Sequence, residues 1–446
     1  MARAERNSPG LDRDAANLRR ALDTLLATAP RYALDLCVVL LPFWLRRIDL
    51  NEAQRRFDDA LAAAPDRTAL RARALLAAAS IDLRSGTVAR SLAHAEESRA
   101  VASEIGDARA EWRALQFLGE LGVAADAVDV ARRWLEPALD LARRQGFAAG
   151  AAVGVYSMGV AYWILGDLDR AEELVARSID MLRPLAGSPE RIPSPVNIAD
   201  HRTSGLDNRP SLSMVFEDTL QPFVEISCDT AVSYALANQA GIVRARGDLM
   251  RAHALLDESA ARFEAAGDQQ GGATVLARRG YLEFARGAIP QARVALEEVL
   301  ALRRAQGDRR GQGLALSGLA FVETTAGDYD SAERHLAEAR DIFRRGGDRW
   351  GLSGALWRTA DLAFARGDVD GAQRALEETR AVLGPTQRER WIAHTLVGLA
   401  EVALLRDDVE AARALLADAR ERYASRDDAA GVADVDDRMR GLPRGV

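Results

Sequence analysis

The chain contains no lysine, so arginine supplies all 59 of its basic side chains. This absence excludes mechanisms that need a lysine amine, such as a phosphate-binding loop, a kinase-type lysine or a Schiff base. Together with abundant alanine it is also what a GC-rich genome produces. The 66 acidic side chains give a formal net charge of −7. Because nucleic-acid binding depends mostly on neutralising phosphates, we expect no direct nucleic-acid partner.

Cysteine and long apolar runs are also scarce. The two cysteines, Cys37 and Cys228, lie far apart, which argues against a disulfide framework and favours a reducing compartment. The most apolar stretch, residues 36–45, contains a proline and is about half the length that a membrane span needs. The N-terminus, MARAERNSPGLDRD, lacks the apolar region of a signal peptide. The sequence therefore predicts a soluble, cytoplasmic protein with no membrane partner.

The common catalytic and metal-binding patterns are missing too. The sequence has no H-E-x-x-H, no paired Cys-x-x-Cys and no G-x-S-x-G. His335 and Glu338 share a helix face at i, i+3, but such a pair is more typical of a solvated surface than of a metal site. Gly311 and Gly313 follow no strand, which excludes a dinucleotide fingerprint. We predict no catalytic residue, no metal, no cofactor and no enzyme activity.

What the sequence does have is a repeat with a period of about 40 residues. A Gly-Asp-type turn recurs at this spacing, and a second marker of the same kind alternates with it half a period away. The first set is Gly86, Asp126 and Gly166, then Gly247, Gly287, Gly327, Gly367 and Asp407, and the second is Gly267, Gly307, Gly347 and Asp427. Glycine ends a helix because it tolerates a positive φ, and the following Asp caps the next helix. The period predicts one helical hairpin per repeat, stacked into a solenoid in which each repeat packs only on its neighbours.

Side-chain size follows the same period. The residue seven positions before the first turn type is always small: Ala79, Gly119, Gly159, Ala240, Gly280, Ala320, Ala360 and Ala400. Nine positions after the turn, most of the repeats have leucine. Small residues where two helices cross, with a larger knob opposite, favour close hairpin packing. With aromatics at 6% and few β-branched runs, the chain is predicted to be all-α.

The turn motif resembles that of the tetratricopeptide repeat (TPR). The segment Gly-Asp-Tyr-Asp-Ser-Ala at 327–332, followed by Leu336 and Ala339, carries most of the family's turn and second-helix signature. The array departs from TPR in its longer period, since a TPR unit has about 34 residues, and it lacks the regular tryptophan and the closing proline. A HEAT-like array has a suitable period, but the turn favours TPR. The prediction is a TPR-like helical-repeat solenoid of about nine repeats.

The register breaks once, because Gly166 and Gly247 are separated by one position more than two periods. Residues 187–227 hold five prolines, too many for a helical hairpin, and are interpreted as a non-helical insertion. Residues 195–203 and 211–220 are expected to pair as a short β-hairpin. The predicted organisation is an N-terminal cap (1–30), repeats 1–4 (31–186), the insertion (187–227), repeats 5–9 (228–426) and a C-terminal capping segment (427–446).

The N-terminal region resembles the helical region that follows the ATPase module in STAND-type bacterial signalling proteins and in LuxR-like and SARP-like transcriptional regulators. The resemblance begins with Asn-Leu-Arg-Arg-Ala-Leu at 17–22 and Leu-Pro-Phe-Trp-Leu-Arg-Arg at 41–47, and extends through the Arg-Gly-Asp and Ala-Gly-Asp turns. It implies that the chain is a sensor and protein-contact array. ATP hydrolysis and DNA binding belong to upstream modules of that family and are not expected here.

The candidate binding surface is the concave face of the array. In the TPR register this face is formed by four positions of each A helix, which is the first helix of a hairpin. All four positions come before the first turn type in the sequence. The candidates are Tyr156, Trp163, Tyr234, Arg244, Tyr281, Phe284, Phe321, Trp357, Asp361, Phe364, His394 and Glu401. Aromatics with a few charges on such a surface are typical of peptide or ligand anchors, although an aromatic stripe at helical spacing is equally typical of core packing.

Three functions remain open from the sequence. The first is a non-enzymatic scaffold for protein–protein interaction in bacterial signalling or transcriptional regulation, with the groove and the insertion as contact surfaces. The second is a sensor that binds a peptide or a small-molecule effector in the groove. The third is an enzyme on a helical scaffold, for which the sequence shows no constellation of reactive residues.

Overall fold

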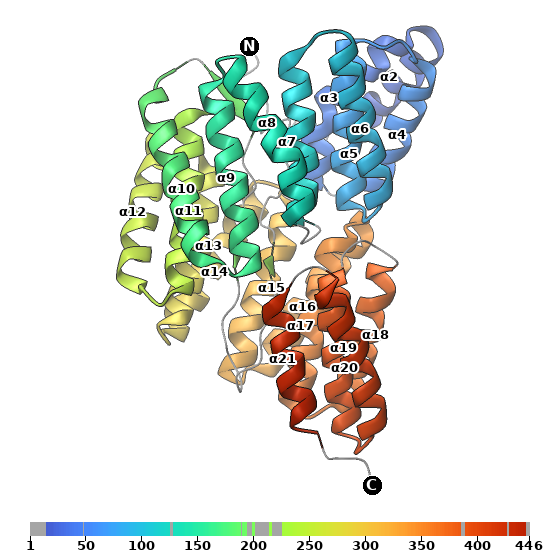
Figure 1. Ribbon diagram of the computed structural model, residues 1–446. Helices are drawn as coiled ribbons and strands as arrows, with labels where there is room; N and C mark the ends of the chain where they lie inside the picture. The colour runs from blue at the N-terminus through green and yellow to red at the C-terminus, as the bar shows by residue number, and fades with distance from the viewer. Residues whose placement is uncertain are drawn as a thin grey trace.

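The structure is a computed structural model that describes residues 15–47, 49–124, 128–188, 190–193, 199–200, 214–215, 225–384, 389–425 and 428–442. The chain is a succession of antiparallel helical hairpins (Figure 1). The helices are α2 (Ala15–Thr28), α3 (Pro30–Arg47), α4 (Leu50–Ala63), α5 (Ala69–Arg84), α6 (Val88–Glu104), α7 (Ala108–Ala124), α8 (Val128–Arg144), α9 (Ala148–Leu165), α10 (Leu168–Leu182), α11 (Cys228–Ala245), α12 (Leu249–Ala265), α13 (Gln269–Ala285), α14 (Ile289–Ala305), α15 (Arg309–Ala326), α16 (Tyr329–Gly346), α17 (Arg349–Arg366), α18 (Val369–Leu383), α19 (Glu389–Leu404), α20 (Val409–Ala424) and α21 (Ala429–Arg440).

From α3 to α20 the odd-numbered helices come first in each hairpin and are the A helices, and the even-numbered ones are called B helices. This arrangement is an all-α, TPR-like helical-repeat solenoid, as the repeat period predicts. Among the described residues, no helix is long and apolar enough to span a lipid bilayer.

The turns form where the glycines are. Within the described residues, the glycines of both marker sets have a positive φ, and Asp407, which replaces glycine in the last hairpin, is the non-glycine residue with a positive φ of 59°. The markers Asp126 and Asp427 lie outside the described residues. The Asp after a turn caps the next helix: its carboxylate accepts a hydrogen bond from the backbone N–H three positions on, as at Asp248, Asp328 and Asp368. Local backbone preference thus sets the period.

Where the small residue seven positions before the turn is glycine, a large side chain of the B helix lies against it. A Cβ at Gly119 would overlap the side chain of Leu135, and one at Gly280 would come within 3.2 Å of Leu296. Where this position is Ala79, its carbonyl oxygen accepts a hydrogen bond of 2.7 Å from the buried Ser91 hydroxyl. These close approaches bring the two helices together along one crossing line.

Between hairpins, glycine again makes room, this time for an aromatic ring. Phe263, Phe343 and Tyr423 occupy the same register position near the ends of their B helices. Each lies against a glycine in the first turn of the next helix, where a Cβ would overlap the ring: Gly271, Gly351 and Gly431. All three rings are at most 2% exposed. The contact fixes how each hairpin stacks on the next.

The insertion contributes short strands. Strand β1 (Arg191–Pro193) pairs antiparallel with β4 (Glu225–Ser227), with Ile192 opposite Ile226, and both isoleucines are buried. Strand β2 (Ala199–Asp200) pairs antiparallel with β3 (Met214–Val215), with Ala199 opposite Val215. Both β2 and β3 fall within the segments expected to form a hairpin, and the rest of those segments lies outside the described residues.

The solenoid curves back onto itself, which the sequence did not predict. In Figure 1 the chain runs from α2–α6 (blue) through α9–α12 and returns to α15–α18 (orange) beside the first hairpins. Helix α3 contacts α15, Asn51 lies against Gly347, and Arg349 lies against Gly86. A second long-range contact joins α9 and α19, where Arg390 Nη1 donates a 2.7 Å hydrogen bond to the carbonyl of Ile164. The repeats therefore contact more than their neighbours in sequence, because the superhelical turn is tight.

Candidate functional site: a hollow between the A helices

A solvent-open hollow lies where the inner faces of four successive A helices meet. It encloses about 460 Å³ of free space, including open solvent. Its lining residues are Tyr281 from α13, Leu314, Ser317 and Gly318 from α15, Trp350, Gly351, Gly354, Ala355 and Arg358 from α17, and Trp391 from α19.

Two tryptophans form one wall of the hollow. The rings of Trp350 and Trp391 meet edge to face, with centroids 5.3 Å apart and an interplanar angle of 63°. On α17 itself Gly354 faces open space, since a Cβ there would have no neighbour within 4 Å. Aromatic walls next to a missing side chain make a surface that favours a large apolar group.

Polar side chains also line the hollow. The hydroxyl of Tyr281 occupies the space that a side chain at Gly318 would fill, and Ser317 lies beside it. Tyr281 also lines two smaller hollows, one with Arg244 and Arg278 and one with Arg303. Tyr281 is thus a shared wall of three adjoining concavities on the inner face of the array.

The guanidinium of Arg358 is held at the base of the hollow. It lies over the Phe321 ring, 4.0 Å from the centroid, and its Nη1 is 3.6 Å from an Asp361 carboxylate oxygen. Burial lowers the pKa of Arg358 below its ordinary value, and the nearby Asp361 opposes that shift. Aromatic stacking and a carboxylate together compensate the desolvated charge.

Most of the aromatic residues predicted to line a groove are instead packed inside. Eight of the twelve candidates are at most 9% exposed: Tyr156, Trp163, Tyr234, Tyr281, Phe284, Phe321, Trp357 and His394. The other four, Arg244, Asp361, Phe364 and Glu401, are half-buried. The inner faces of the A helices are in mutual contact because the superhelix is tight. Seven of the eight buried side chains therefore have the packing role that the sequence left open, and Tyr281 lines the hollow.

The structure gathers the candidates into separate groups. Around Arg358 it brings together Tyr281, Asp361 and the ring pair Phe284–Phe321, whose centroids are 4.6 Å apart at an interplanar angle of 49°. A second group forms where Asn238 bonds to the Tyr156 hydroxyl and to the Tyr234 carbonyl.

Further candidates pair with residues outside the predicted set. The Trp163 ring fills the space above Gly241. His394 is hydrogen-bonded to Tyr423. Trp357 and Phe364 belong to one apolar cluster of the last hairpins.

The sequence analysis missed Trp350, Trp391 and Arg358. They lie on the A helices at positions other than the four register positions that were searched. The available signal was the glycine pattern: Gly318 and Gly354 sit in helix interiors where glycine is unfavourable, which indicates space reserved for something else.

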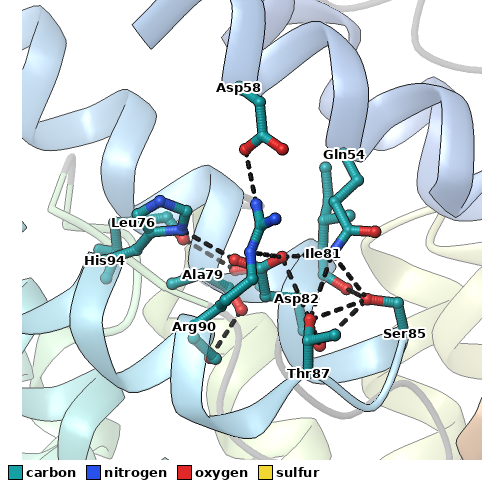
Figure 2. Close-up of polar contacts among 12 residues, drawn as sticks. Gln54, Asp58, Leu76, Ala79, Ile81, Asp82, Ser85, Thr87, Arg90 and His94 are labelled. Atoms are coloured by element: carbon teal, nitrogen blue, oxygen red, sulfur yellow. Dashed lines mark hydrogen bonds and ion pairs between the residues drawn. The ribbon is translucent and has the colours of Figure 1, made fainter. Parts of the chain in front are cut away.

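Buried polar groups elsewhere stabilise the hairpins. Asp82, whose side chain is 1% exposed, accepts hydrogen bonds from Gln54 (2.6 Å) and Thr87 (3.2 Å), lies 2.8 Å from His94 Nδ1, and has Arg90 Nε at 3.4 Å (Figure 2). These partners come from α4 and from the start of α6, so one carboxylate holds three helices together.

The acid–histidine pair of this network recurs in a later hairpin. His335 Nδ1 lies 2.8 Å from a carboxylate oxygen of Glu323. In both pairs the acid comes four positions before a turn glycine and the histidine eight positions after it. Among the described residues, no group of three His, Cys, Asp or Glu side chains could hold a metal ion. These pairs are therefore structural contacts across the turn.

A second buried acid has neutral partners. Glu120 on α7 accepts a 2.9 Å hydrogen bond from Gln116 and a 3.5 Å bond from the Ser157 hydroxyl of α9. Burial raises the pKa of Glu120 to about 7, and these two hydrogen bonds oppose the rise.

The fold and the hollow define the chain as a TPR-like solenoid with a concave inner face. No family model matches the sequence, and a search of curated proteins finds no match. Among solved structures, the Rap conjugation gene regulator of plasmid pLS20 in complex with the Phr* peptide is 13% identical, with a TM-score of 0.48, covering 88% of this chain and 96% of that one.

Two further structures are similar at the same level. Yeast Tom70 is 13% identical, with a TM-score of 0.41, over 97% of this chain and 98% of its own. A STAND protein with a tetratricopeptide repeat sensor from Pyrococcus horikoshii is 11% identical, with a TM-score of 0.44, over 83% of this chain and 52% of its own. With identities this low and TM-scores below 0.5, what those proteins bind says nothing about this chain.

Proposed function

We propose that this chain is a non-enzymatic scaffold whose hollow binds a peptide or a segment of a partner protein. The observation that carries the proposal is the hollow itself, open to solvent, walled by Trp350 and Trp391, and kept empty by Gly354. A large apolar side chain entering beside Gly354 would be buried against both indole rings. Anchors of this kind supply most of the affinity in helix- and peptide-binding grooves.

The chain offers a direct way to block the hollow. Gly354→Leu places a side chain in open space on a helix that tolerates it, so the fold should be retained while the hollow is filled. Gly272→Leu is the matched control, because Gly272 also lies early in an A helix, also faces open space, and does not line the hollow.

Peptides selected from a random library against the wild-type protein would provide the ligand. We expect them to share a large apolar or aromatic anchor, and we expect Gly354→Leu to weaken their binding by roughly tenfold or more while Gly272→Leu does not, as measured by calorimetry. Selection that returns no binder, or binders that the two variants affect equally, would contradict the proposal.

A second candidate is a small-molecule sensor, which the two tryptophan rings beside the open space at Gly354 favour. A ligand that binds the folded state must raise the apparent stability, by about 2.7 kcal/mol at a hundredfold excess over Kd. A thermal-shift screen with apolar aromatic compounds tests this, and stabilisation that persists in Gly354→Leu would exclude the hollow as their site.

The biological setting that we propose is bacterial signalling or transcriptional regulation. It rests on the resemblance of the sequence to the helical region of STAND-type, LuxR-like and SARP-like regulators. Co-purification with the crosslinked protein from its native cell would test it, and repeated recovery of partners with no regulatory role would count against this setting without affecting the proposed hollow.

A further inference from the structure

One contact recurs between successive A helices in the C-terminal half of the chain. An arginine near the start of one helix pairs with the Asp that caps the helix two further along the chain. Arg310 Nε lies 3.1 Å from Asp348, and Arg390 Nε lies 2.8 Å from Asp428. All four side chains are at most 9% exposed, so the position requires a carboxylate to neutralise a buried guanidinium.

In the N-terminal half, the same position lacks the carboxylate. Arg109 occupies the arginine position of α7, and the sequence has Phe147 where the later repeats have Asp348 and Asp428. The Arg109 guanidinium lies over the Phe147 ring, 5.2 Å from its centroid, and donates a 2.7 Å hydrogen bond to the backbone carbonyl of Arg191. Its charge is therefore not neutralised by the contact that neutralises Arg310 and Arg390.

Two further arginines lie beside Arg109. Arg73 on α5 and Arg113 on α7 are one period apart and occupy the same register position. Arg109 and Arg113 are four positions apart on one face of α7. Burial first, and then the charges of Arg109 and Arg73, lower the pKa of Arg113 to about 10. Among the described residues, neither Arg73 nor Arg109 forms an ion pair.

The repeat register places these arginines on the same surface as the hollow. Leu314 and Gly354, which line the hollow, occupy the register position of Arg73 and Arg113, and Trp350 occupies that of Arg109. The inner face is thus apolar around α15–α19 and positively charged around α5–α7.

The helix ends add to this positive charge. Arg109 lies in the first turn of α7, where the helix macrodipole disfavours cations, and Arg73 and Arg113 lie in the second turn of their helices. Helix α5 has no acidic residue in its first turn. In α7, Asp107 accepts a 2.9 Å hydrogen bond from the Ala110 N–H, and its charge opposes the lowering of the Arg113 pKa. Glu111 is two positions from both Arg109 and Arg113 and so faces elsewhere.

We propose that Arg73, Arg109 and Arg113 form a binding surface for an acidic, extended polypeptide segment. Adjacent A helices are about 8–10 Å apart, and carboxylates three positions apart on an extended chain are separated by about 10 Å. One acidic segment crossing α5 and α7 therefore reaches arginines of both helices. The Phe147 ring beside Arg109 gives the aliphatic side-chain carbons of such a segment an apolar surface. This surface is separate from the proposed hollow and does not depend on it.

A fluorescent polyglutamate peptide of about ten residues, which spans roughly 33 Å when extended, is the probe, with a polyglutamine peptide as the neutral comparison. We expect the full-length protein to bind the first and not the second, with affinity falling as salt rises. Arg73→Gln/Arg109→Gln should weaken binding by roughly tenfold or more. The matched control, Arg55→Gln/Arg144→Gln, makes the same charge change at exposed positions on the B helices α4 and α8 and should leave binding unchanged.

A second variant restores the missing carboxylate. Phe147→Asp should cap α9 and pair with Arg109, as Asp348 does with Arg310, so binding should fall in a protein that still folds. Phe147→Ala, which adds no charge, should keep most of the binding. Equal weakening in the test and control arginine pairs, or no binding by the wild type, would overturn the proposal. Pyrophosphate binding at these arginines without peptide binding would overturn its assignment to a polypeptide.

Discussion

The buried carboxylates Asp82 and Glu120 differ in the partners that compensate the cost of burying their charge. Asp82 is surrounded by Arg90, His94 and neutral donors, so its charge has cationic partners. The described partners of Glu120 are the Gln116 amide and the Ser157 hydroxyl, which donate hydrogen bonds but carry no charge. Burial without a cation favours the protonated acid, which makes Glu120 a source of pH dependence.

We predict that stability falls with rising pH because of Glu120. The unfolded chain releases this proton near pH 4.5, whereas the folded protein holds it to about pH 7. The contribution is therefore fully present below pH 4.5 and is lost as the pH rises through 7, by roughly 3 kcal/mol. Glu120→Gln cannot titrate, so the difference in free energy of unfolding between wild type and variant should change by this amount across that interval.

Denaturant titrations at a series of pH values measure this difference. Glu136→Gln, at a glutamate whose side chain is 56% exposed, is the control and should follow the wild-type profile. Parallel profiles for wild type and Glu120→Gln would show that Glu120 is ionised in the folded protein.

Residue-level pairing was the part that sequence patterns predicted least well. His335 was considered with Glu338 on its own helix, but the structure pairs it with Glu323, on the other side of the turn. Spacing within one helix finds neighbours at i+3 and i+4, whereas contacts across a turn depend on how two helices cross. The recurrence of the pair at Asp82 and His94 was the available signal.

At the scale of elements, glycine has two opposite roles on one helix. In α17, Gly351 lies against the Phe343 ring, and a Cβ there would overlap it. Less than one turn later, Gly354 faces open space. Helix propensity alone would favour alanine at both positions by about 1 kcal/mol.

We predict that Gly351→Ala destabilises the protein by about 1–3 kcal/mol, because the inter-hairpin contact must open to admit the methyl group. Gly354→Ala should stabilise it by up to about 1 kcal/mol, because nothing opposes the gain in helix propensity. Thermal unfolding of the two variants side by side measures both. Similar effects of the two substitutions would mean that the Phe343 contact does not control how α16 stacks on α17.

Turns and hairpins were predictable because their causes are local. A glycine at a positive φ and an Asp cap act within a few positions, so the period, the helix limits and the small residues at the crossings all follow from the printed sequence. The hollow was not predictable in this way. It depends on how tightly successive A helices curve, which buries Tyr156 and Phe321 while leaving Gly354 open.

At the scale of the whole molecule, the chain departs from the simplest solenoid, in which stability is a sum over neighbouring repeats. Arg390 is far from Ile164 in sequence, yet it donates to the Ile164 carbonyl while pairing with Asp428. Its guanidinium therefore joins α9, α19 and the start of α21. Unlike the neighbour contacts, this link couples distant repeats.

We predict that Arg390→Met increases hydrogen exchange in two places at once, at the C-terminal end of α9 and in α19–α21. Methionine keeps much of the side-chain volume but leaves the Ile164 carbonyl and the Asp428 carboxylate without this donor, a loss of about 3–5 kcal/mol in the region that depends on it. Arg310→Met, which removes the corresponding Asp348 pair, is the control and should increase exchange around α15 and α17 but not in α9. If Arg390→Met left α9 as protected as in the wild type, the Arg390 link would contribute nothing to stability, and α9 would open independently of α19–α21.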